Sequence, residues 1–359
     1  MRAPAEPAPS ALVERKADHL DLCEGDAVSF RAQTTLLECV RLLHQSLPEL
    51  AAEEVSTETA LLGRTLRAPL VIAAMTGGHE RAASINRSLA SIAERGGYAL
   101  GLGSQRAMQR DPELEWTYRV REWAPSILLF GNIGVVQARE TPTRALEELV
   151  KDVGADALCV HLNPAMELIQ SDGDRDFRGC VETLRRLCGE LSVPVIAKET
   201  GNGMSPQTIA KLHSAGVRYV DTSGAGGTSW VGVETMRADG VRRSIGERLW
   251  DWGIPTAPSI AFAARRGMTT IATGGVRSGH DVARALALGA KVAGIARPVL
   301  QALHREGEDG ARAFLEEVVS ELRAVMLLTG TAELSDLTNT PKLVDGELSR
   351  WLSLDGDGR

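Results

Sequence analysis

Three chemically useful side chains, an imidazole, an amide and a carboxylate, occur within seven positions at His161, Asn163 and Glu167. They follow an apolar run at 156–160 that is typical of a buried strand. Glu167 would suit Mg2+, which prefers one or two carboxylates together with substrate phosphates, although a surface salt bridge would also explain it. Met166 stands beside Glu167 and brings a thioether, which accepts hydrogen bonds poorly and donates none.

Several cationic residues suggest an anionic ligand. Lys198 ends an apolar run, and a buried lysine needs an anionic partner or a lowered pKa. It would form a Schiff base, face an anionic reduced flavin, or extend its ammonium to solvent. Arg106 is a candidate for binding a diphosphate, because a guanidinium matches phosphate oxygens in pairs. Arg15, Lys16 and His19 form a basic cluster that, taken alone, is typical of a solvated surface.

A glycine-rich turn at 274–279 lies between an apolar run and a helical pattern, and the pair Ala296-Arg297 follows the next apolar run. Tight turns need glycine for reasons of conformation alone. In α/β barrels, however, the loops after the last two strands commonly bind phosphate through backbone N–H groups. The two segments together therefore favour a phosphate site.

These residues need a scaffold that brings strand ends together. Apolar runs alternate with amphipathic stretches from residue 69 onward, and runs of this kind are typical of a parallel sheet covered on both faces. Strands are expected at 69–75, 97–103, 126–132, 156–162, 194–199, 217–222, 269–273 and 291–296, with helical patterns at 81–95, 177–191, 207–215 and 280–288. Eight such units predict an α/β fold, a closed (β/α)8 TIM barrel, with a doubly wound open sheet as the alternative.

Three parts of the chain are expected. An N-terminal helical extension, 1–68, would pack on the barrel, with its first ten or so residues disordered and a candidate helix at 36–43 covering the bottom or side. The catalytic barrel would span 69–330, and a C-terminal tail, 331–359, would pack on the surface. The long connection at 223–256 is a candidate lid or subunit contact.

Composition narrows the class of protein. The 359 residues include 40 basic and 47 acidic side chains, so a nucleic-acid surface is not indicated. No apolar run reaches the roughly 20 residues that cross a bilayer, and no apolar segment near the N-terminus resembles a signal peptide. Five cysteines, without metal-binding spacing, predict reduced thiols in a cytoplasmic protein, with Cys159 as a core residue.

The ordered motifs resemble those of the type 2 isopentenyl-diphosphate isomerase family, FMN-dependent enzymes that interconvert isopentenyl and dimethylallyl diphosphate. The resemblance runs from Arg15-Lys16 to Gly346-Glu347-Leu348, nearly the whole chain. It is carried by Met75-Thr76-Gly77-Gly78, Gly103-Ser104-Gln105-Arg106, Asn132-Ile133-Gly134, His161-Leu162-Asn163, Gly173-Asp174-Arg175, Lys198-Glu199, Gly224-Ala225-Gly226-Gly227-Thr228-Ser229-Trp230, Trp250-Asp251-Trp252-Gly253-Ile254-Pro255-Thr256 and Gly274-Gly275.

The resemblance implies FMN at the strand ends, Mg2+, NADPH as the reductant of the flavin, a prenyl diphosphate substrate, and a homotetramer or homo-octamer. The implied flavin contacts are Ala74, Met75, Thr76, Ser104, Asn132, Lys198, Ser223, Thr228, Gly275, Val276, Arg277, Ala296 and Arg297. The implied substrate contacts are Arg15, Lys16, Ser104, Gln105, Arg106, His161 and Asn163, and Glu167 is the implied metal ligand. Reduced flavin would act as the acid–base group, with Lys198 stabilising its anionic ring and His161 facing the substrate.

Met166 departs from the family pattern, which has a glutamine before the metal-binding glutamate. Proton handling by this side chain is lost, although Gln170, one helical turn later, would be near enough to reach the site. Either the flavin alone transfers the protons, or the chain is a diverged FMN-binding paralogue that acts on another prenyl diphosphate or is inert. An FMN-dependent hydroxy-acid oxidase would need a histidine after strand six, and a purine-nucleotide dehydrogenase a cysteine there. Residues 223–256 contain neither.

Overall fold

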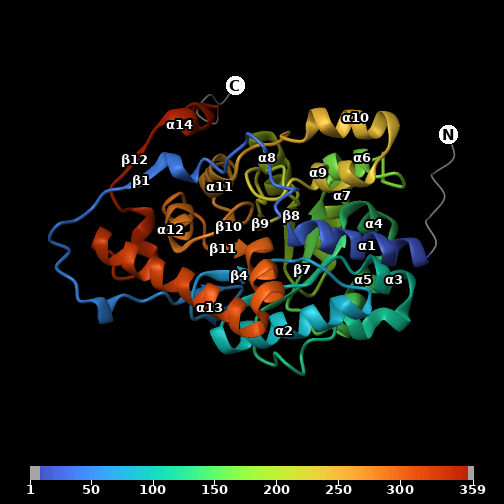
Figure 1. Cartoon of the computed structure of the whole chain (residues 1–359), viewed down its shortest axis with the longest axis horizontal. Helices are drawn as coiled ribbons and strands as arrows, with labels where there is room; N and C mark the ends of the chain where they lie inside the picture. Colours follow the sequence, from blue (N-terminus) through green and yellow to red (C-terminus); the bar gives the residue numbers. More distant parts are fainter. Residues whose placement is uncertain (1–8, 355–359) are drawn as a thin grey trace.

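Eight parallel strands close into a barrel in the computed structural model, which describes residues 9–354, with side chains from residue 15 (Figure 1). The strands are β4 (Leu70–Ile72), β5 (Ala99–Gly101), β6 (Leu129–Gly134), β7 (Ala157–Leu162), β8 (Val195–Glu199), β9 (Tyr219–Asp221), β10 (Thr269–Ala272) and β11 (Val292–Ile295). They pair in chain order, and β11 returns to β4. The predicted barrel is therefore confirmed, and the open-sheet alternative is wrong.

Helices surround the barrel, and those expected from the sequence are present as α2, α7, α8 and α12 (Figure 1). The full set is α1 (Pro9–Glu24), α2 (Glu80–Gly96), α3 (Arg106–Arg110), α4 (Val135–Glu140), α5 (Thr143–Asp152), α6 (Pro164–Ile169), α7 (Cys180–Glu190), α8 (Pro206–Ser214), α9 (Trp230–Arg237), α10 (Gly240–Leu249), α11 (Thr256–Arg265), α12 (Gly279–Ala287), α13 (Arg297–Thr329) and α14 (Gly346–Ser353). Short 3-10 turns lie at Leu37–Cys39, Ala52–Glu54, Pro112–Thr117 and Leu334–Thr338. No helix between residues 9 and 354 is both long and apolar enough to cross a membrane.

The inside of the barrel is filled by side chains from the strands. Val71, Phe130, Cys159 and Ile196 are buried in one apolar cluster there. Cys159 is buried, as expected for a core residue, and burial raises the pKa of its thiol to about 12. Since the strands are also covered by helices outside, they carry apolar residues on both faces.

A short hairpin closes the lower end of the barrel. It is formed by β2 (Thr59–Leu61) and β3 (Arg64–Leu66), which pair antiparallel. Leu61 and Leu66 are buried against the apolar cluster inside the barrel. The Arg64 guanidinium bonds Asp156 at 2.6 Å, just before β7, and fixes the hairpin at the amino ends of the strands. The open cavity accordingly lies at the opposite end, where the strands finish.

The candidate helix at 36–43 is wrong. Leu36 has a left-handed φ of 56°, a 3-10 turn follows at Leu37–Cys39, and β1 (Val40–Leu42) pairs antiparallel with β12 (Lys342–Val344). The hydroxyls of Thr34 and Thr35 accept hydrogen bonds from the backbone N–H groups of Leu36 and Leu37, which competes with helix formation. The sequence showed apolar residues here but not the distant strand that pairs with them.

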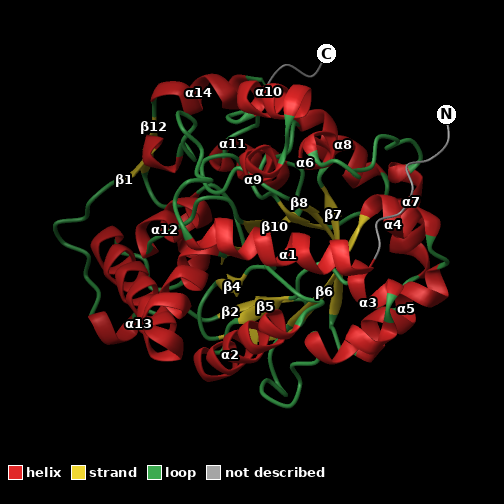
Figure 2. Ribbon diagram, turned by 45° about the vertical axis from the view of Figure 1, so that its right-hand side comes forward, coloured by secondary structure: helices red, strands yellow, loops and turns green. Residues whose placement is uncertain are grey.

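The N-terminal helix α1 lies across the barrel mouth, as Figure 2 shows. It contacts α3, α9 and α13. The predicted disorder of the first ten residues falls mostly on 1–8, outside the described residues, whereas Pro9 and Ser10 already belong to α1. Arg237 pairs with Asp18 at 3.0 Å and Arg81 pairs with Asp21 at 2.5 Å, so ion pairs attach the helix on two sides.

Candidate active site at the barrel mouth

A cavity of about 660 Å³ lies at the carboxyl end of the barrel strands, beneath α1. Residues that end or follow all eight strands line it, and α1 contributes Arg15, Lys16 and His19. Parallel strands bring their carboxyl ends to one face of a barrel, which explains why residues so far apart in sequence meet here.

The structure brings almost every residue singled out from the sequence to this cavity. The lining includes Arg15, Lys16, Ala74, Met75, Thr76, Ser104, Arg106, Asn132, His161, Asn163, Met166, Glu167, Lys198, Ser223, Thr228, Gly275, Val276, Arg277, Ala296 and Arg297. Gln105 is the exception: its fully buried amide donates to the Leu149 carbonyl at 3.1 Å and accepts from the Asn132 N–H at 2.9 Å. Gln105 therefore supports Asn132 from behind and does not reach the cavity as a substrate contact.

The tautomer of His161 is fixed by its neighbour. The Asn132 side-chain N–H donates to the Leu102 carbonyl at 3.0 Å, so its Oδ1 must face His161 Nδ1, 2.9 Å away. Nδ1 therefore carries the proton, and Nε2 is a hydrogen-bond acceptor. Burial, and then the charges of Lys198, Arg106 and Lys16, lower the pKa of His161 to about 3. His161 is neutral near pH 7 in the ligand-free protein.

Lys198 has its anionic partner within the protein. Its Nζ lies 3.3 Å from Asp221 Oδ2, and it donates to the Glu199 carbonyl at 2.9 Å. Asp221 ends β9 beside Lys198 on β8 and accepts a further hydrogen bond from the Thr273 hydroxyl. Asp221 was not predicted from the sequence as a site residue. Its position, a carboxylate at the end of an apolar strand, would have been the indication.

Lys16 joins α1 to the loops after β4 and β5. Its ammonium donates to the Gly77 carbonyl at 2.7 Å, the Ser104 carbonyl at 3.0 Å and the Tyr118 hydroxyl at 2.8 Å. Burial, and then the charges of Arg15 and Arg106, lower its pKa to about 7. Since all three donors of a protonated Lys16 already have acceptors, its place in this structure is to position α1 at the cavity.

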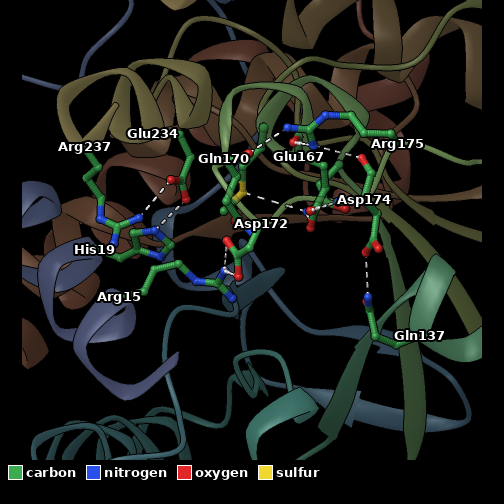
Figure 3. A network of polar contacts seen from close by, with 12 residues as sticks. Arg15, His19, Gln137, Glu167, Gln170, Asp172, Asp174, Arg175, Glu234 and Arg237 are labelled. Carbon is green, nitrogen blue, oxygen red and sulfur yellow. Dashed lines mark hydrogen bonds and ion pairs between the residues drawn. The ribbon is translucent and has the colours of Figure 1, made fainter. Parts of the chain in front are cut away.

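Arg15 and His19 extend the attachment of α1, as Figure 3 shows. The Arg15 guanidinium pairs with Asp172 at 3.1 Å, and His19 Nε2 lies 2.8 Å from Glu234. Burial acts to raise the pKa of Glu234, but the bond from His19 and the charge of Arg237 lower it overall. His19 lines the cavity, so the cluster read from the sequence as a solvated face is instead part of the wall.

Glu167 offers a buried carboxylate with room for a cation. Its Oε1 accepts from the Asn163 amide at 2.9 Å and its Oε2 from the Asp174 N–H at 2.8 Å, which leaves lone pairs on both oxygens. Burial raises the pKa of Glu167. No group of three or more His, Cys, Asp or Glu side chains in the described part of the chain would hold a metal by itself. Glu167 therefore fits Mg2+ that shares its other ligands with a substrate and water.

Four buried polar atoms of the cavity wall have no hydrogen-bond partner among the described residues: Thr76 Oγ1, Arg106 Nε, Gln170 Nε2 and Arg297 Nη1. A buried unpaired donor costs about 1–3 kcal/mol. Such atoms at one cavity indicate a polar ligand.

The loops after β10 and β11 suit a phosphate group. Gly275 has a φ of 76°, and a Cβ there would lie 2.7 Å from the Gly226 carbonyl oxygen, so the close approach of these two loops requires glycine. Arg297 begins α13, and its guanidinium donates to the Ser29 hydroxyl at 2.7 Å while Nη1 stays unpaired. A phosphate beside Arg297 would satisfy that donor and face a helix N-terminus.

Sequence comparisons show which known proteins this chain is similar to. The model of the "FMN-dependent dehydrogenase" family matches residues 136–344. A protein named isopentenyl-diphosphate delta-isomerase from Synechococcus sp. is 47% identical over 331 residues, which cover 91% of this chain and 94% of that protein. One of the same name from Methanothermobacter thermautotrophicus is 43% identical over 345 residues, 96% of each chain.

Solved structures with the same fold include flavin oxidases. A lactate oxidase (putative) of Pediococcus acidilactici matches with a TM-score of 0.65 at 16% identity, over 96% of this chain and 97% of that one. A mandelate oxidase variant with an FMN adduct matches with a TM-score of 0.64 at 19% identity, over 90% and 95%. At such low identity these matches show the shared barrel alone.

Proposed function

The chain belongs to the type 2 isopentenyl-diphosphate isomerase family, and we propose from this premise that it interconverts isopentenyl and dimethylallyl diphosphate with reduced FMN and Mg2+. The observation that carries the proposal is the cavity itself, where residues after eight strands meet and four buried polar atoms lack partners. NADPH is the proposed reductant of the flavin.

FMN would lie against the strand ends. The residues proposed to hold it are Ala74, Met75, Thr76, Ser104, Asn132, Lys198, Ser223, Thr228, Gly275, Val276, Arg277, Ala296 and Arg297, all of which line the cavity. The unpaired Thr76 hydroxyl and Arg297 guanidinium nitrogen are the donors that a flavin mononucleotide would satisfy. When bound, reduced FMN would supply an acid–base group that adds a proton to the terminal methylene carbon of isopentenyl diphosphate and removes one from the internal carbon on the other side of the branch, so that the double bond shifts by one position.

The substrate diphosphate would be held by the other half of the wall. Arg106, with an unpaired Nε, is the proposed principal contact, and Ser104, His161 and Asn163 complete the set. His161 presents an unprotonated Nε2, so its contact with a diphosphate oxygen requires a proton from the substrate or solvent. Arg15 and Lys16 add positive charge and position α1 over the ligand.

Lys198 is proposed to place a positive charge beside the flavin ring, held by Asp221. Glu167 would bind Mg2+, which would share the charge of the diphosphate. Met166 cannot move a proton, so in this chain its thioether shapes the cavity and excludes water.

The proposed organisation follows the same division. The proposed extension is 1–68, whose described part covers both ends of the barrel; the proposed catalytic barrel is 69–330 and the proposed tail 331–359. A cytoplasmic homotetramer or homo-octamer remains a proposal that rests on the family.

An anaerobic assay tests the function. Purified protein loaded with FMN and reduced with NADPH or dithionite should convert isopentenyl diphosphate to dimethylallyl diphosphate when Mg2+ is present. Absence of that product would contradict the isomerase and favour a diverged FMN-binding paralogue, which acts on another prenyl diphosphate or is inert. Oxidation of 2-hydroxy acids is not expected, because residues 223–256 supply no histidine base.

A further inference from the structure

We propose that the carboxamide of Gln170 donates a hydrogen bond to the diphosphate of the bound substrate, an inference that rests on the proposed function. Gln170 directly follows α6 and lines the cavity. The residue is only 2% exposed, and its Nε2 has no hydrogen-bond partner among the described residues.

The backbone of Gln170 is rigidly held, so the unpaired amide is not a consequence of a loose segment. Its N–H donates to the Met166 carbonyl at 3.1 Å, and its carbonyl accepts from Arg175 Nη2 at 2.7 Å. Figure 3 shows Gln170 in the same neighbourhood as Glu167 and Asp172, the residue that binds Arg15. A buried donor fixed at a cavity wall in this way awaits an acceptor from the ligand.

Few groups around Gln170 could accept a hydrogen bond from its side-chain amide. Met166 lies one turn earlier on α6, and its sulfur is a weak acceptor that is already 3.9 Å from the Asn163 amide. On its other side, Ile169 packs in a small apolar cluster with Val231 and Ala238. The protein therefore leaves the Gln170 amide without an acceptor among the described residues around it.

The chemistry of the substrate identifies the acceptor. The hydrocarbon part of a prenyl diphosphate has no lone pair, so only diphosphate oxygens can accept from Gln170. The flavin also has acceptors, but its proposed contacts lie mainly after β4 and β9–β11, whereas Gln170 follows β7 together with Glu167 and His161. Gln170 is thus a substrate-binding residue on the side of the cavity that holds the metal and the diphosphate.

Binding of inorganic diphosphate tests the inference without depending on turnover. Calorimetry on FMN-loaded protein with Mg2+ should show that Gln170→Met, which keeps the length but removes the donor, binds diphosphate about 10- to 100-fold more weakly. Gln170→Glu should bind more weakly still, because it sets a negative charge beside the anion. The affinity for FMN, followed by flavin fluorescence, should stay within about twofold of wild type in Gln170→Met.

The stability of the ligand-free protein provides a second test. Gln170→Met should weaken diphosphate binding but should not weaken the fold. In the absence of diphosphate, Gln170→Met should unfold at the same urea concentration as wild type or a higher one, because a buried unpaired donor has been removed. Gln301→Met is the matched control: that amide borders the same cavity but already donates to the Glu24 carbonyl and to Asp26, both at 3.2 Å. It should bind diphosphate as wild type does.

Three results would overturn the inference. Unchanged diphosphate affinity in Gln170→Met would show that the amide does not contact the substrate. A fall in FMN affinity alone would assign the donor to the cofactor, and a lower urea midpoint with normal diphosphate binding would assign it to the fold. Wild-type protein that fails to bind diphosphate would instead contradict the proposed function itself.

Discussion

Lys198 and Asp221 form an ion pair inside the barrel mouth, with Nζ and Oδ2 3.3 Å apart and the two side chains only 10% and 7% exposed. They lie side by side in register on β8 and β9. An ammonium at this depth is tolerated because the neighbouring strand supplies the compensating carboxylate. A ligand at this part of the cavity therefore faces an ammonium group whose charge is partly balanced by the Asp221 carboxylate.

Removal of one partner should therefore be costly. Asp221→Asn leaves Lys198 buried without its counter-ion and should lower the free energy of unfolding by about 3 kcal/mol, measured by urea denaturation. A double variant, Lys198→Met with Asp221→Leu, should recover much of that loss because neither charge remains. Asp176→Asn, at an exposed pair with Arg178, is the control and should unfold like wild type. Equal stability of Asp221→Asn and wild type would show that the pair contributes nothing.

His161 should make stability depend on pH in a defined window. Its pKa in the folded protein is lowered to about 3, below the ordinary value of 6.5, by burial and by nearby cations. Between these values the unfolded chain binds a proton that the folded protein does not, so the free energy of unfolding falls as pH drops from 6.5 towards 3. The contribution approaches about 1.4 kcal/mol per pH unit.

Urea titrations between pH 4.5 and 7 check this contribution. His161→Asn should lose less stability than wild type as pH falls, because the titrating ring is gone, while the exposed His44→Asn controls for the substitution itself. The other charged groups near the ring, Lys198, Arg106 and Lys16, are retained in both proteins. Parallel pH profiles for wild type and His161→Asn would contradict the assignment.

Met166 should have little influence on the rate. Its sulfur contacts only the Asn163 amide at 3.9 Å among polar groups of the described residues, and it cannot transfer a proton. Met166→Leu, which conserves volume, and Met166→Gln should both turn over isopentenyl diphosphate within about threefold of wild type in the anaerobic assay. A rise of tenfold or more in Met166→Gln would mean that an amide at this position is what the chain lacks.

Glu167 should control the requirement for magnesium. In Glu167→Gln the charge is lost, and the amide can no longer accept from both Asn163 and the Asp174 N–H without leaving one donor unpaired. The Mg2+ concentration for half-maximal activity should rise at least about tenfold, since Mg2+ depends on carboxylate ligands. FMN binding, measured by fluorescence, should not change. An unaltered Mg2+ dependence would place the metal elsewhere.

The sequence predicts the barrel and most of its cavity because both depend on local patterns. Each strand is an apolar run of its own, and its last polar residue necessarily lies at the mouth. Partnerships between distant segments carry no such local signal. The bond that turns Gln105 away from the cavity involves Leu149, and the β1–β12 pair joins residues that no short window contains. Asp221 carried a local signal as a carboxylate at the end of an apolar strand, but its pairing with Lys198 on the neighbouring strand did not.

The antiparallel pairing of β1 with β12 also constrains how the chain can fold during synthesis. Val40 pairs with Val344, so β1 has no partner strand until residues about 300 positions further along the chain have left the ribosome. Until then the edge of β1 is exposed, and an unpaired edge is where chains associate wrongly. The segment that holds β12 and α14, with its buried Leu348, can therefore pack against β1 only after the whole barrel has been synthesised.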